Sequence, residues 1–205
     1  MKTKFAIYSV LFSGLLFTLM LNCKKEALKV APTVTISEAT NITANSATVG
    51  SIISADGGSE VLSRGVCWNS SGNPSTSDNK TTDGKGMGSF TSSLTSLSPG
   101  TTYNLKSYAT NAIGIAYSSQ TTFKTLALLA TLTTTEASTI ASTTFSSGGN
   151  VTNDGGAEVT ARGVCWSTTQ NPTIADSKTS DGTGTGIFTS SVTGLTPGTT
   201  YYIRS

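Results

Sequence analysis

LSPGTTY, the stretch Leu97–Tyr103, returns as LTPGTTY at Leu195–Tyr201, and this repeated turn decides the fold. RGVCW at Arg64–Trp68 returns at Arg162–Trp166 with the same offset of 98 residues. The two copies align without a gap from residue 31, matched to residue 129, to residue 107, matched to residue 205. A period of this length is too long for a solenoid unit and fits a small duplicated domain. We therefore expect two copies of one domain.

Period-2 alternation of Thr, Val, Ile and Tyr runs through both copies, and clusters of Gly, Asn, Asp and Pro interrupt it. The pattern predicts an all-β protein with two tandem β-sandwiches, over residues 31–126 and residues 129–205. The strands expected in the first copy are Thr33–Ser37, Ala47–Ser54, Val61–Trp68, Ser89–Thr95, Thr102–Asn111 and Ile115–Lys124.

The second copy ends in register at Ser205, which corresponds to Ser107. Residues 108–125 of the first copy, which should finish the strand expected at Thr102–Asn111 and form the last strand, therefore have no counterpart in the sequence. We expect the second sandwich to be incomplete.

The composition limits the function. The sequence has no histidine, which excludes a Ser-His-Asp triad, a histidine general base and a histidine-containing metal site. Charged residues make up 12 % of the chain and the net charge is +2, too little for a nucleic-acid-binding surface. These numbers predict a protein that is not an enzyme and has no cofactor and no nucleic-acid partner.

Residues 1–22 have the layout of a secretory signal, with two lysines before an uncharged apolar run at Phe5–Leu21. Cys23 follows at once, which resembles a bacterial lipoprotein signal, although Asn22 replaces the usual small residue. The alternative is an uncleaved membrane helix, because a span needs only ~17–25 residues.

The lipoprotein resemblance implies that residues 1–22 are removed and that Cys23 is lipidated. The mature protein would be exported and anchored to the bacterial outer membrane or cell surface. Residues 23–30 would then form a short tether between the lipid and the first sandwich.

The LSPGTTY and LTPGTTY turns resemble the E–F corner of fibronectin type III domains, in which Pro presets the turn and Gly completes it. The resemblance implies that Tyr103 and Tyr201 are tyrosine-corner residues, with hydroxyls bonded to upstream backbone. The RGVCW strand resembles the fibronectin-like repeats of Bacteroidetes-type bacteria. Ordinary fibronectin type III domains carry tryptophan on strand B, whereas Trp68 and Trp166 fall on the expected strand C. We therefore describe the repeats as fibronectin-III-like.

The candidate ligand face depends on which side of the RGVCW strand faces the core. If the small residues Gly65 and Cys67 face inward, alternation exposes the other side. Such a basic and aromatic face can stack on sugars or hold a protein. One alternative is a structural cation–π pair within the sheet, worth ~0.5–1 kcal/mol; another is the reverse parity, which buries the tryptophan. The expected face comprises Arg64, Trp68, Lys106 and Tyr108, with Arg162 and Trp166 in the second copy.

Cys67 and Cys165 hold equivalent places in separate domains, and a disulfide needs Cα atoms within ~7 Å. We therefore expect two buried thiols. Aspartates at the turns could supply oxygen ligands to Ca²⁺. Asp is also a standard turn residue, however, so we predict no metal site. The aspartates are Asp56, Asp78 and Asp83, with Asp154, Asp176 and Asp181 in the second copy.

These features predict a non-catalytic surface lipoprotein that acts as a structural spacer or as an adhesion-type module for a surface protein. One alternative is a carbohydrate-binding accessory protein of a glycan-uptake system, with a polysaccharide as its ligand. The other is the non-catalytic stalk of a longer enzyme.

Overall fold

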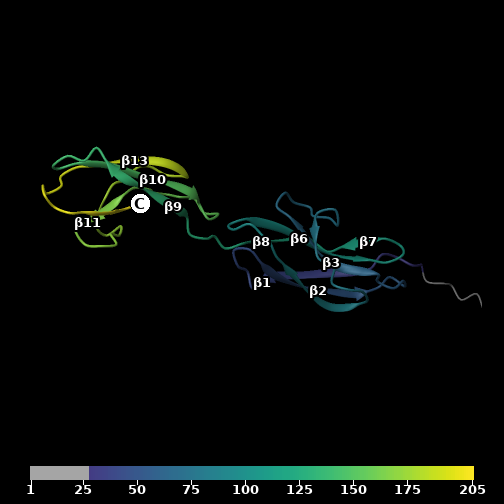
Figure 1. Ribbon diagram of the computed structural model, residues 1–205. Helices are drawn as coiled ribbons and strands as arrows, with labels where there is room; N and C mark the ends of the chain where they lie inside the picture. The colour runs from purple at the N-terminus through teal and green to yellow at the C-terminus, as the bar shows by residue number, and fades with distance from the viewer. Residues whose placement is uncertain (1–27) are drawn as a thin grey trace, which may run out of the picture.

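The computed structural model describes residues 28–205, and all regular structure in this part of the chain is β-strand. Two β-sandwiches follow one another along the chain (Figure 1), which confirms the predicted all-β, fibronectin-III-like architecture. The expected signal at residues 1–22, Cys23 and the start of the tether lie outside the described residues. Among residues 28–205, no helix is both long enough and apolar enough to cross a bilayer.

The first sandwich consists of two antiparallel sheets. One has the strand order β1-β2-β5, and the other has the order β4-β3-β6-β7, with β8 also paired to β6. With β1, β2 and β5 as strands A, B and E, and with β3, β6 and β7–β8 as strands C, F and G, this is the separation found in immunoglobulin-like sandwiches. The strands are β1 (Thr33–Thr40), β2 (Ala47–Ala55), β3 (Ser63–Asn69), β4 (Asn79–Lys80), β5 (Gly88–Leu94), β6 (Thr102–Thr110), β7 (Ile115–Tyr117) and β8 (Thr121–Lys124).

The second sandwich repeats this plan with sheets β9-β10-β13 and β12-β11-β14. These strands correspond in order to β1 through β6, and residues 129–205 contain no counterpart of β7 or β8. The strands are β9 (Thr131–Ser138), β10 (Phe145–Asn153), β11 (Cys165–Ser167), β12 (Ser177–Lys178), β13 (Gly186–Val192) and β14 (Tyr202–Arg204).

The strands expected from the sequence agree with the observed ones to within three residues at each end, with two differences. β4 has only two residues, too few to show a period. The strand expected at Ile115–Lys124 is divided into β7 and β8. At the division the hydroxyl of Ser118 accepts a hydrogen bond from the Ser107 N–H at 3.0 Å, so a side chain replaces a backbone partner in the ladder.

The main core of the first sandwich lies between its two sheets, and Tyr103 stacks there on Phe123 with ring centroids 5.8 Å apart. Full burial of one large apolar side chain contributes ~1.5–3 kcal/mol. The core is therefore the main source of stability. Its buried members are Ala47, Val49, Val66, Trp68, Leu94, Leu97, Tyr103, Leu105 and Phe123.

The tyrosine corner has the geometry that the repeated turn predicts. The hydroxyl of Tyr103 accepts the N–H of Ser98 at 3.0 Å, and that of Tyr201 accepts the N–H of Thr196 at 3.2 Å. The turn between Ser98 and Tyr103 needs glycine, because φ of Gly100 is +60°. Each corner thus ties the start of strand F to the chain that precedes it.

Tyr103→Phe is expected to lower the free energy of unfolding of the first sandwich by ~0.5–1.5 kcal/mol, because the ring stays in the core and one hydrogen bond is lost. Amide exchange of residues 31–126 in the full chain measures this loss. Tyr201→Phe is the matched control, since it should leave the first sandwich unchanged. Unaltered exchange in Tyr103→Phe would show that the corner bond contributes nothing to stability.

Candidate functional site

The RGVCW strand turns its larger apolar side chains inward. Val66 is fully buried and Trp68 is 9 % exposed, and both belong to the core between the sheets. The expectation that Trp68 lies exposed on a ligand face is therefore wrong, and the reverse parity is correct. The reason is the apolar area that each side chain can bury: burial of an indole removes far more apolar surface from water than burial of Gly65 or Cys67 could.

Lys106 and Tyr108 lie on the opposite side of this sheet from Trp68. Tyr108 pairs directly with Gly65 and Lys106 with Cys67, and directly opposed residues share a face. Tyr108 is 3 % exposed, and its hydroxyl donates to the carbonyl of Thr81 at 2.7 Å. The expected exposure of Tyr108 is also wrong, so the predicted residues do not form one ligand face.

Arg64 holds the loop between β4 and β5 in place. Its Nε donates to the carbonyl of Asp83 at 3.1 Å, and its Nη1 donates to the carbonyls of Gly86 and Met87 at 3.0 and 2.9 Å. The guanidinium carbon lies 4.9 Å from the centre of the Phe90 ring. Arg64 is therefore a structural residue, and its aromatic partner is Phe90 rather than the expected tryptophan.

The second copy repeats these contacts of the arginine with the loop, which we call the arginine clamp. Arg162 donates to the carbonyls of Asp181, Gly184 and Thr185 at 3.4, 3.2 and 2.9 Å, and it lies 5.5 Å from the Phe188 ring centre. Trp166, by contrast, is only half-buried. The arginine of the RGVCW motif thus has the same structural role in both copies.

In each copy, a polar cluster also stabilises the loop that the arginine contacts, which in the first sandwich joins β4 to β5. The carboxylate of Asp83 accepts the hydroxyls of Thr81 and Ser92 at 2.6 and 2.5 Å, and Ser92 is fully buried. Thr81 in turn accepts the N–H of Val66 at 2.9 Å. The second copy places Thr179, Asp181 and Ser190 in the same arrangement.

The other aspartates serve turns. Asp56 accepts the N–H of Gly58 at 2.9 Å, and Asp78 accepts the N–H of Ser75 at 2.8 Å, a bond that lowers the pKa of the Asp78 carboxyl. Within residues 28–205, no three His, Cys, Asp or Glu side chains are grouped so as to hold a metal ion.

Cys67 and Cys165 are buried thiols without a disulfide. Each S–H donates to a carbonyl of the neighbouring strand at 3.3 Å, that of Lys106 or that of Arg204. Burial raises the pKa of Cys67 to about 11, so the reactive thiolate is scarce at neutral pH. Cys67 is therefore unsuited to act as a nucleophile.

The exposed face of β6 carries a group of amides around Lys106, which we call the amide patch. Lys106 Nζ donates to Asn73 Oδ1 at 2.5 Å and lies 5.9 Å from the ring centre of Tyr117. Gln120 accepts the N–H of Asn73 at 2.8 Å and donates to Asn104 at 2.9 Å. The patch thus joins one cation, three amides and a partly exposed tyrosine.

The second copy has a related group. Asn171, Tyr202 and Arg204 hold the positions of Asn73, Asn104 and Lys106, and they line a hollow of about 390 Å³. A sequence signal for this site existed: both copies place a cation on strand F and an Asn-Pro pair before β4 or β12.

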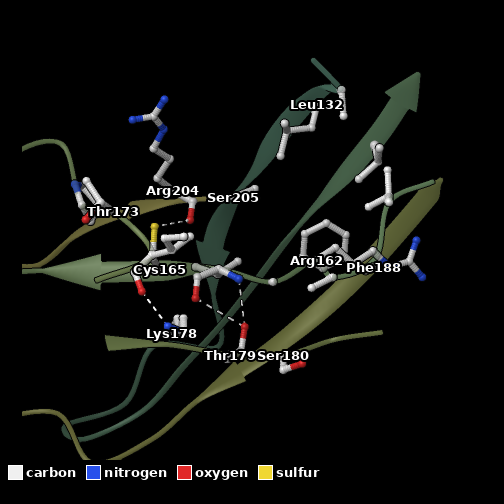
Figure 2. A pocket seen from close by; sticks show the side chains of 18 residues that line it. Leu132, Arg162, Cys165, Thr173, Lys178, Thr179, Ser180, Phe188, Arg204 and Ser205 are labelled. Atoms are coloured by element: carbon white, nitrogen blue, oxygen red, sulfur yellow. Dashed lines mark hydrogen bonds between the residues drawn. The ribbon is translucent and has the colours of Figure 1, made fainter. Parts of the chain in front are cut away.

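A larger cavity, of about 610 Å³, opens in the second sandwich (Figure 2). Leu132 and Phe188 line one part of it, and Cys165 and Thr179 line another. The hydroxyl of Thr179 accepts the N–H of Val164 at 2.8 Å, as Thr81 does from Val66 in the first sandwich. The cavity therefore lies beside residues whose counterparts are covered in the first copy.

No known protein family and no curated protein matches the sequence. Among solved structures, the chain is similar to the sensor domain of the anti-sigma factor RsgI4 from Pseudobacteroides cellulosolvens, with 22 % identity, 48 % of this chain and 98 % of that chain covered, and a TM-score of 0.37. It is also similar to a segment of two fibronectin type III domains from chicken tenascin, with 16 % identity, 85 % and 89 % coverage and a TM-score of 0.41.

Proposed function

We propose that this protein is a non-catalytic, lipid-anchored surface protein in which tandem sandwiches act as a structural spacer. The observation that carries the proposal is the joint between the sandwiches. Leu126 donates its N–H to Thr43 at 3.0 Å and accepts the N–H of Gly100 at 3.1 Å, so the first sandwich holds it from both sides. Leu128 donates its N–H to Gly155 of the second sandwich at 2.8 Å. Only Ala127 separates the two attachments, which leaves little freedom between the domains.

The turn that holds Leu128 also contacts the first sandwich. A β-carbon on Gly156 would overlap the carbonyl of Pro99, at the E–F corner. The first copy holds its own entering segment in the same way, because the N–H of Val30 donates to Gly57 at 2.9 Å. Each copy therefore fixes the segment that enters it, which suits a chain of domains with constant spacing.

A distance measurement between the domains tests the spacer. Spin labels on cysteines introduced at the exposed positions Ser119 and Thr169, in a Cys23→Ser chain, should give one narrow distance distribution. Inserting Gly-Ser-Gly-Ser after Ala127 should broaden it. Equally broad distributions in both chains would contradict a fixed joint.

The anchor is supported by the basic start, the apolar run and the cysteine that follows it. The tether is short: from Cys23 to Val30, which within residues 28–205 is the first to bond the sandwich through its backbone, the chain can extend at most ~25 Å. Lipidation at Cys23 would therefore hold the first sandwich close to the membrane surface.

Labelled palmitate should enter the wild-type protein in a bacterial host, and Cys23→Ser should lose the label together with membrane association. Cys67→Ser is the matched control and should keep the label, because that thiol is buried. Equal labelling of wild type and Cys23→Ser would exclude this anchor.

The amide patch favours polysaccharide binding as a second candidate function. Amides and a cation can bond sugar hydroxyl and carboxylate groups, and Tyr117, 37 % exposed, offers a ring face. Lys106→Ala and Tyr117→Ala should reduce retention on immobilised acidic polysaccharide, whereas Lys124→Ala, exposed on β8, should not. Equal retention by all three variants would remove the patch from consideration.

A further inference from the structure

The chain enters the first sandwich at the end that lies away from the second sandwich (Figure 1). Four segments meet at this end: the entering segment and the loops β2–β3, β4–β5 and β6–β7. The side-chain amide of Asn111 donates to the carbonyls of Val30 and Asp56 at 2.7 and 2.8 Å. Gly86 donates its N–H to the carbonyl of Val61 at 2.9 Å. These hydrogen bonds hold the four segments together as one surface.

Each of these four segments presents a large apolar side chain that is about half-exposed. We call the four side chains the apolar tip: Val30, Leu62, Met87 and Ile113. At the opposite end of the sandwich, within the described residues 28–126, the loops at 41–46 and 95–101 expose no large apolar side chain. Apolar side chains that gather on one exposed surface mark an interaction site. The first sandwich therefore has one end that favours an apolar partner.

The second copy shows that the fold itself does not require the apolar tip. Thr160 and Thr185 hold the positions of Leu62 and Met87. The arginine clamp holds the loop in both copies, with methionine or with threonine beside it. This end of the second sandwich meets the first sandwich, at Gly156. The apolar residues thus occur in the copy that is nearer to the proposed anchor.

The charges at this end of the first sandwich suit a lipid surface without net charge. Outside the arginine clamp and the polar cluster, the four segments carry two cations and two acids, and these charges cancel. Attraction to an interface must then come from buried apolar area, which sets the binding strength of interfacial surfaces together with charge. The charged residues are Lys29, Asp56, Glu60 and Lys85.

We propose that the apolar tip inserts into the membrane interface and seats the first sandwich on the lipid bilayer. This inference rests on the proposed anchor at Cys23, because a tether of at most ~25 Å keeps the tip near the lipid. One acyl chain alone gives only weak, reversible binding, of about 10⁴ M⁻¹. The tip would supply a second membrane contact. The second sandwich, at the far end of the first, would then be held away from the bilayer.

A chain with a single acyl group tests the tip. Residues 23–205 are coupled at Cys23 to palmitoyl maleimide, which the two buried thiols of the RGVCW strands should not meet. Partition onto phosphatidylcholine vesicles is then measured by sedimentation. The double variant Leu62→Thr/Met87→Thr, which has the residues of the second copy, should partition about tenfold less, because two apolar side chains no longer enter the lipid. Ile187→Thr is the matched control, 77 % exposed on the second sandwich, and should partition like the wild type.

A quencher carried by the lipid locates the end that contacts the bilayer. Ile113→Trp places an indole at the tip, and Thr95→Trp places one at the exposed opposite end. The seven residues of β5 alone separate the two ends by about 20 Å. Nitroxide-labelled phosphatidylcholine should therefore quench the added fluorescence of Ile113→Trp and leave that of Thr95→Trp unchanged.

Three results would overturn the proposal. The first is equal partition of the wild type and the double variant, with amide exchange in β2 verifying that both are folded. The second is equal quenching at residues 113 and 95. The third is a dimer of the acyl-free chain that the double variant abolishes, which would assign the tip to a second copy. Failure of palmitate labelling in cells would exclude only the anchor, because the coupled acyl chain replaces it in the vesicle assay.

Discussion

Trp68→Ala is expected to destabilise the first sandwich by ~3–5 kcal/mol, the usual loss when a buried tryptophan is truncated. The indole is 9 % exposed and belongs to the main core, so its removal leaves a cavity between the sheets. Trp166→Ala is the matched control, because Trp166 holds the same position in the second copy but is only half-buried. Its loss of stability should be clearly smaller.

The effect of Trp68→Ala is measured by denaturant titration of the full chain, with amide exchange of residues 31–126 as the signal for the first sandwich. A variant that unfolds at the same denaturant concentration as the wild type but loses affinity for a sugar or protein would restore the ligand-face interpretation. Unfolding at lower denaturant, with unchanged Trp166→Ala behaviour in this domain, supports the structural role.

Asp83→Ala is expected to cost ~2–4 kcal/mol, because the hydroxyls of Thr81 and Ser92 lose their acceptor and each unpaired buried group costs ~1–3 kcal/mol. Ser92 is fully buried, so water cannot easily replace the carboxylate. Asp83→Asn keeps one carbonyl oxygen and should lose less stability. Asp181→Ala should produce a comparable loss confined to the second sandwich.

Denaturant unfolding and domain-resolved amide exchange measure these three variants. If Asp83→Asn destabilises as much as Asp83→Ala, the charge matters rather than the acceptor. If Asp83→Ala unfolds like the wild type, the cluster does not hold the loop, and the clamp by Arg64 must suffice alone.

The sequence predicted the fold well because its strongest signals are local. The offset of 98 residues indicated two copies of one β-sandwich, and the LSPGTTY turn placed the Tyr103 hydroxyl near the preceding backbone, where the structure has it bonded to Ser98. Turn chemistry and repeat register depend on neighbouring residues, so they can be recognised without knowing the tertiary packing.

The candidate site was predicted poorly because it depends on packing between distant segments. Alternation separates the two sides of β3 but does not say which one faces inward. The decisive fact, that the Tyr108 ring covers Gly65, joins strands that are far apart in the sequence. The amide patch could not be predicted for the same reason, since Asn73, Lys106 and Gln120 come from two loops and a strand.

The Asp-Gly-Gly turn has a consequence for how such chains can grow. Each copy carries on its own body the turn that fixes the preceding segment, Gly57 for Val30 and Gly155 for Leu128. A gene duplication therefore copies the connector together with the domain, and no compensating change in the neighbour is required. An array can then gain or lose copies during evolution while the spacing between neighbouring domains stays constant. The number of copies in the gene therefore sets the length of the array.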